Sequence, residues 1–153
     1  MTDLWQDFCS HHHRLFDLTC EEYEILLSGN IDDLEKIIGL KKDIVSSIKT
    51  LEEKREKIVK RLSVLFNTKE EISSVSDFII VMKKYGVAVP GDFFERYNSL
   101  LIDLIEKIQD QNVKNQVFLN KSLLSLKEIR EGILGNKSYK TYNEKGTEYP
   151  LLK

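Results

Sequence analysis

The chain has 153 residues, enough for one domain with its own core, and its 31% of charged residues with only two prolines is typical of helical bundles. The net charge of −2 gives no electrostatic reason to expect nucleic-acid binding. The longest apolar run, residues 78–82, is far shorter than the roughly 20 residues of a membrane-spanning helix, so we also expect no membrane insertion.

The first predicted helix covers residues 2–28, whose apolar residues form two adjacent stripes wide enough to face a core. Its acidic start lacks the basic and apolar regions of a signal peptide. Cys9 and Cys20 would lie about 16 Å apart along this helix, too far for a disulfide, which favours two reduced thiols. At Gly29-Asn30 the chain either turns or only kinks.

Three consecutive histidines, His11 to His13, form the one cluster with metal chemistry in the sequence. Neighbouring residues of a helix point in different directions, and no further residues at ligand spacing complete the four-ligand set of a structural zinc site. Sequence motifs of P-loops, nucleophile elbows and zinc proteases are absent as well. We therefore predict no metal, no cofactor and no enzymatic activity.

The second predicted helix covers residues 30–66 and has apolar residues in seven-residue steps, a period that packs long helices along a narrow seam. The longer of its two apolar rows consists of Ile37, Ile44, Leu51, Ile58 and Leu65. Lys41 and Arg55 occupy seam positions in the other row. We expect their stems to pack and their charges to extend outward, while a role in setting register or binding a partner stays open.

The third predicted helix covers residues 69–85. Thr68 and Glu71 have the spacing of a capping box at its start, and Gly86 is suited to end it. The segment from Val87 to Gly91 contains a Pro-Gly pair and is predicted to be a loop.

The fourth predicted helix covers residues 92–134, and its apolar stripe is interrupted by Gln111, Asn112 and Asn115. We interpret Asn112 and Asn115 as a buried polar layer that sets the register of packing. The stripe then resumes at spacings of three and four residues, shifted by about one position. The residues of this second stripe are Leu119, Leu123, Leu126, Ile129 and Ile133. They either belong to the core or bind a partner.

Residues 136–153 are polar, aperiodic and rich in tyrosine, a pattern typical of a flexible tail. The sequence thus predicts an all-α fold. We expect an elongated antiparallel bundle with coiled-coil-like packing in residues 1–135, followed by the flexible tail 136–153.

Two stretches and the tail resemble the FlgN-type flagellar export chaperones. The first stretch, residues 26–34, is similar to that family's leucine pair followed by a small residue and Gly-Asp or Gly-Asn, and Lys41 and the Leu51–Arg55 segment continue the pattern. The second stretch, residues 112–123, resembles the family's Asn-x-x-Asn segment that ends in Ser-Leu. A tyrosine with a glycine shortly after it follows at residues 142–146, although the usual Tyr-Gly pair is Tyr-Asn here.

The resemblance implies a cytoplasmic chaperone that binds hook–filament junction proteins and delivers them to the flagellar type III export gate. The second stripe would then receive an apolar face of a client helix, because its spacing suits helix-in-groove binding. The tail tyrosine with which the family docks on the cytoplasmic domain of the gate corresponds to Tyr142, with Tyr139 as its neighbour.

Two other classes of function stay open. One is a structural coiled-coil adaptor or self-associating scaffold without a client, and a homodimer is compatible with either this class or a chaperone. The other is a regulator or enzyme subunit that binds metal at His11 to His13.

Overall fold

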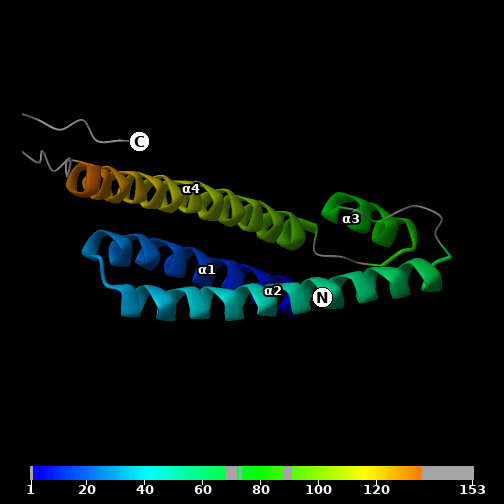
Figure 1. Ribbon diagram of the computed structural model, residues 1–153. Helices are drawn as coiled ribbons and strands as arrows, with labels where there is room; N and C mark the ends of the chain where they lie inside the picture. Colours follow the sequence, from blue (N-terminus) through cyan, green and yellow to red (C-terminus); the bar gives the residue numbers. More distant parts are fainter. Residues whose placement is uncertain (1, 68–71, 73, 88–90, 136–153) are drawn as a thin grey trace, which may run out of the picture. The chain divides into compact units, whose positions relative to one another are not determined.

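A computed structural model describes residues 2–67, 72, 74–87 and 91–135. The chain divides into two compact units, Met1–Gln116 and Val117–Lys153. The described residues form four helices and contain no strand, which confirms the predicted all-α class (Figure 1). The helices are α1 (Thr2–Ser28), α2 (Ile31–Leu65), α3 (Val75–Lys84) and α4 (Gly91–Gly135).

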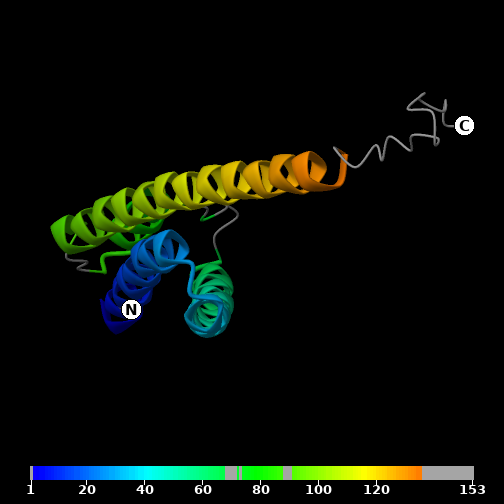
Figure 2. The same ribbon diagram turned by 60° about the vertical axis from the view of Figure 1, so that its left-hand side comes forward.

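The chain turns between α1 and α2, so that the two helices form an antiparallel hairpin (Figure 1 and Figure 2). Gly29 has a φ of +71°, a value that residues with a side chain rarely adopt, and it ends α1. Asn30 is the N-cap of α2, and its side-chain oxygen accepts a hydrogen bond from the Asp33 N–H at 3.3 Å. A turn rather than a kink therefore separates the helices, and the predicted bounds of both helices agree with the structure to within one residue.

The predicted start of the third helix is wrong, because α3 begins at Val75 rather than near residue 69. Ser74 is its N-cap: the Ser74 hydroxyl accepts a hydrogen bond from the Asp77 N–H at 3.0 Å, while the Asp77 carboxylate accepts one from the Ser74 N–H at 2.9 Å. Ile72 precedes this cap and is not helical. The proposed cap residues Thr68 and Glu71 lie outside the described residues.

Gly86 ends α3 as predicted, with a φ of +70°. The Gly86 N–H donates to the Lys83 carbonyl at 3.1 Å and the Val87 N–H donates to the Met82 carbonyl at 3.0 Å. This pair of hydrogen bonds is a Schellman motif, which satisfies carbonyls that the last helical turn leaves without partners.

The first unit has two apolar clusters, one around α3 and one between α1 and α2. The first cluster contains Ile72, Phe78, Ile79, Val81, Met82 and Phe94. The second contains Leu4, Phe8 and Leu51, with Ile48, Ile58 and Leu101 packed against it. Four buried residues of α3 lie within five positions, 78–82, so the stability of this short helix comes mainly from its packing.

Within the first unit, α4 runs parallel to α1 and antiparallel to α2. Gln6 and Tyr97 are joined by a hydrogen bond near the start of both helices, and Thr19 and Asn115 are joined further along. Lys41 of α2, which lies early in its helix, meets Asn112, which lies late in the first-unit part of α4. The described part of the second unit is the remainder of α4, residues 117–135.

Candidate partner-binding surface

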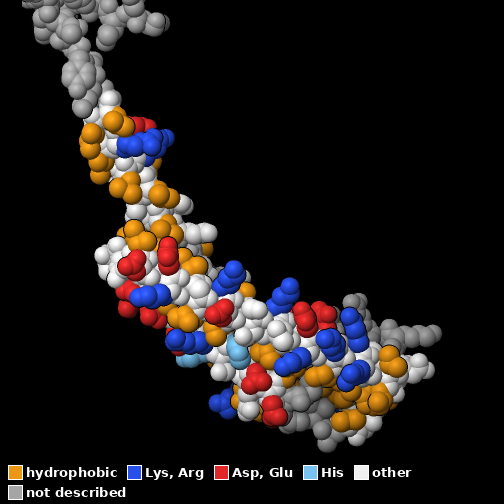
Figure 3. All heavy atoms as spheres, turned by 60° about the horizontal axis from the view of Figure 1, so that its bottom comes forward, with side chains coloured by type: hydrophobic (Ala, Val, Ile, Leu, Met, Phe, Trp, Pro, Cys, Tyr) orange, Lys and Arg blue, Asp and Glu red, His pale blue; other side chains and the backbone are white. Residues whose placement is uncertain are grey.

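The second stripe of α4 is exposed in the structure. Leu119 is 39% exposed, and Leu123, Leu126, Ile129 and Ile133 are each between 57% and 63% exposed. Figure 3 shows hydrophobic side chains gathered along the helical segment that leads into the grey residues. Contiguous exposed apolar surface of this kind marks sites of protein interaction on soluble proteins.

The second stripe continues the face that α4 uses for packing in the first unit. Leu104, Ile108 and Asn115 lie on this face and are at most 7% exposed. Leu119 and Leu126 follow Asn115 at steps of four and seven residues, which keeps them on the same side of the helix. The same helix face therefore changes from buried to exposed along its length, while its apolar character is retained.

Tyr139 and Tyr142, the other two predicted site residues, lie outside the described residues.

A buried polar layer connects α1, α2 and α4 just before the second stripe. Asn115 is 3% exposed, and its side-chain nitrogen donates to the Thr19 carbonyl at 3.0 Å and to the Glu22 carboxylate at 2.6 Å. The Asn115 side-chain oxygen accepts a hydrogen bond from Gln111 at 3.1 Å. The Asn115 carboxamide thus forms three hydrogen bonds at a position where water has little access.

Lys41 belongs to the same polar layer, which corrects the expectation that its charge extends outward. Its ammonium donates to the Glu22 carboxylate at 2.8 Å and to the Asn112 side-chain oxygen at 3.2 Å. The side chains of Lys41 and Glu22 are only 17% and 14% exposed. A carboxylate on the facing helix holds the ammonium inward, because two partly buried opposite charges are far more stable paired than separate.

Arg55, the other seam cation, pairs instead with a residue of its own helix. Its Nε lies 3.0 Å from both carboxylate oxygens of Glu52. Hydrogen bonding to Glu52 raises the pKa of Arg55 above its ordinary value, so the guanidinium remains charged at any physiological pH.

Reasoning from the sequence missed Thr19 and Glu22 as members of the polar layer. A signal was present, because Glu22 stands between Leu18 and Ile25 in the apolar stripe of α1, where a third apolar residue would continue the pattern. Glu22 interrupts the apolar stripe of α1, and Lys41 interrupts the seam of α2. The ion pair between them explains both interruptions.

The histidines and cysteines of α1 make local contacts. The Nδ1 atoms of His11 and His12 each lie 2.8 Å from the carbonyl oxygen four residues earlier. The Cys9 thiol donates to the Tyr97 carbonyl at 3.7 Å, and burial raises the pKa of both Cys9 and Cys20. In the part of the chain that the structure describes, no three His, Cys, Asp or Glu side chains are grouped to hold a metal ion.

None of the described helices combines the length and the apolar composition that a bilayer crossing requires.

A family model described as FlgN protein matches residues 1–150, nearly the whole chain. The chain belongs to the FlgN family. FlgN proteins are flagellar export chaperones, which makes this a chaperone family and not an enzyme family. No curated protein and no solved structure matches the chain. The FlgN match agrees with the resemblance found in residues 26–34 and 112–123.

Proposed function

We propose that this FlgN protein acts in the cytoplasm, where it binds hook–filament junction proteins before export and delivers them to the flagellar export gate. The observation that supports this proposal is the second stripe, which has the spacing and composition of a core face and is exposed. A client helix that lays its own apolar face against Leu119, Leu126 and Ile133 would bury these side chains. Each fully buried leucine or isoleucine contributes about 1.5–3 kcal/mol relative to exposure, so a few such contacts suffice for specific binding.

Two segments of the chain would then bind two different partners. Residues 1–135 hold the client through the second stripe, and the tail 136–153 docks on the cytoplasmic domain of the gate through Tyr142, with Tyr139 beside it. A tyrosine suits such a transient interface, because its ring offers rigid apolar area and its hydroxyl remains hydrogen-bonded to water or to the partner.

The test is co-elution of the chain with a hook–filament junction protein in size exclusion. The double variant Leu126→Asp, Ile129→Asp places two charges on the second stripe, and we expect at least about tenfold weaker client binding, because each buried charge would be left without a partner. The matched control, Asn120→Asp with Ser125→Asp, adds the same two charges to exposed positions off the stripe and should bind normally. Circular dichroism should show equal helicity for both variants.

The same experiment separates the chaperone from a self-associating scaffold. A scaffold would cover the second stripe with a second copy of the chain, so that the stripe variant becomes smaller in sedimentation while no client binds the native chain at any concentration. If the stripe variant binds the junction protein as tightly as its control does, the second stripe is not the client site.

A further inference from the structure

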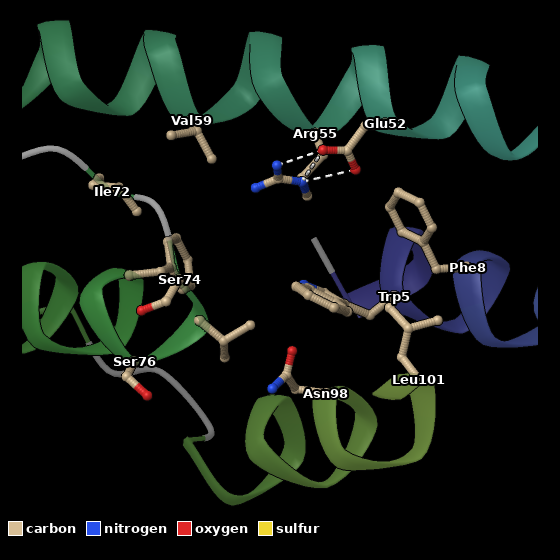
Figure 4. Close-up of a pocket in the computed structure, with 12 residues that line it drawn as sticks. Trp5, Phe8, Glu52, Arg55, Val59, Ile72, Ser74, Ser76, Asn98 and Leu101 are labelled. Atoms are coloured by element: carbon tan, nitrogen blue, oxygen red, sulfur yellow. Dashed lines mark hydrogen bonds and ion pairs between the residues drawn. The ribbon is translucent and has the colours of Figure 1, made fainter. Parts of the chain in front are cut away.

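A cavity of about 360 Å³ lies in the first unit, where α1, α2, α3 and the start of α4 meet (Figure 4). The cavity shares no described lining residue with the second stripe. Its apolar walls are formed by Trp5, Phe8, Val59, Ile72, Val75, Phe78 and Leu101. Its polar lining consists of Glu52, Arg55, Ser74, Ser76 and Asn98.

The cavity is partly open to solvent, so its size is to be compared with that of ligand pockets. At roughly 30 Å³ per water, this cavity corresponds to about twelve water molecules, and its volume lies within the range of about 300–1,000 Å³ that is usual for ligand pockets. Three of its walls are aromatic rings, which favour an aromatic group as the occupant.

Arg55 has a hydrogen-bond donor that no described residue uses. Two of its guanidinium nitrogens bind Glu52. The third has no hydrogen-bond partner among the described residues, and Figure 4 shows it directed away from Glu52. Because Glu52 already balances the charge of Arg55, the unused N–H groups suit a neutral acceptor such as a carbonyl better than a second carboxylate beside Glu52.

Asn98 lies on the other side of the cavity and is a second polar side chain without a hydrogen-bond partner among the described residues. Its carboxamide points into the cavity in Figure 4 and makes no hydrogen bond within the described part of the chain. A carboxamide can both donate and accept, as a peptide group can. An amino-acid residue in a peptide carries one N–H and one carbonyl beside its side chain, which matches the polar groups at the edges of this aromatic-walled space.

The geometry points to a second protein-binding site: the cavity receives one aromatic side chain from a peptide segment of a partner protein, with the main-chain groups beside that side chain held by Arg55 and Asn98. The partner segment is uncharged at the point of entry, because the Arg55–Glu52 pair is neutral as a whole.

The chain carries its own reporter for this site, because Trp5 is its single tryptophan and lines the cavity. The probe is the capped, neutral tripeptide acetyl-Gly-Phe-Gly-amide, titrated against the full chain. The readouts are Trp5 fluorescence and the NMR signals of the Trp5 indole N–H and the Arg55 Nε–H. We expect a saturable change in all three, and a much weaker one with acetyl-Gly-Ala-Gly-amide, which lacks the aromatic ring.

Two variants and a control test the residues. Arg55→Met keeps most of the length of the side chain but removes the hydrogen-bond donor. This substitution should weaken binding of the phenylalanine tripeptide by about tenfold. Val59→Phe fills the cavity and should abolish the response while helicity is kept. Arg61→Met, at an exposed position of the same helix that does not line the cavity, should leave the affinity unchanged.

Three results would overturn the proposal. One is the absence of a saturable response to the phenylalanine tripeptide. Another is a response that survives both Arg55→Met and Val59→Phe. A third is saturation by phenylacetate or phenylethylamine but not by the tripeptide, which would identify a site for small aromatic ions rather than for a protein segment. Client binding through the second stripe is unaffected by any of these outcomes.

Discussion

Asn115 shows how a single polar side chain determines where α4 lies in the first unit. Its carboxamide donates to a backbone carbonyl and a carboxylate of α1 and accepts from Gln111. A shift of α4 by one turn toward its own N-terminus would bring Leu119 to the place of Asn115 and leave the charges of Glu22 and Lys41 against an apolar side chain. Polar residues on a packing seam fix register for this reason, at some expense in stability.

Replacing Asn115 with alanine should destabilise the protein by about 1–3 kcal/mol, because Glu22 loses a hydrogen bond and Gln111 loses its acceptor where water has little access. The measurement is the free energy of unfolding from a urea titration. Asn120→Ala is the matched control, since Asn120 is exposed on the same helix and should change the free energy by less than about 0.5 kcal/mol. Equal effects of the two substitutions would show that the polar layer contributes nothing to stability.

Among the elements, α3 is the one that most needs its cap. It has ten residues, and isolated helices below about 12–15 residues are marginal in water. We expect Ser74→Ala to lower the free energy of unfolding by about 1 kcal/mol, because it removes the acceptor of the Asp77 N–H.

The control for the cap is Ser10→Ala, which changes an exposed serine within α1 and should have little effect or a slightly favourable one. Urea titration of both variants gives the comparison. If Ser74→Ala is as stable as the native chain, packing alone holds α3 in place.

The same element marks the limit of what the sequence predicts about the fold. The apolar periods of α1, α2 and α4 gave their bounds to within one residue, because long periodic segments leave few alternatives. For α3 the sequence offers two capping boxes six residues apart, Thr68 with Glu71 and Ser74 with Asp77. Both pairs have the residue types and spacing of a capping box, and only packing against the rest of the core decides between them.

The candidate site, like the fold, could be predicted from the sequence only in part. Periodicity was enough to find the second stripe on α4 and to suggest a polar layer at Asn112 and Asn115. The inward direction of Lys41 could not be predicted, because it depends on Glu22 of a different helix, and the sequence alone does not give the alignment of α1 with α2. The cavity at Trp5 was missed for the same reason: four separate elements line it.

At the scale of the whole molecule, client binding and docking on the gate should be separable. Tyr142→Ala should weaken binding to the cytoplasmic domain of the export gate by about tenfold or more and leave client binding unchanged, because truncating a tyrosine at an interface hot spot costs about 2 kcal/mol or more. Pull-down of the gate domain and of a junction protein measures both. Tyr149→Ala is the control within the same tail, and if it weakens gate binding as much as Tyr142→Ala does, docking is not specific to Tyr142.

The parallel arrangement of α1 and the first part of α4 has a consequence for how the protein folds. The hairpin of α1 and α2 is built from neighbours in the sequence, whereas the hydrogen bonds from α1 to Tyr97 and Asn115 span 91 and 96 residues. Closing a long loop costs more chain entropy than closing a short one, so distant contacts form more slowly. On the ribosome, where the N-terminal part emerges first, the hairpin ends at Leu65 and must therefore wait for about fifty further residues before Asn115 of α4 can cover it. Until then the ion pair of Glu22 and Lys41 lacks its hydrogen bonds to Asn115 and Asn112 of α4.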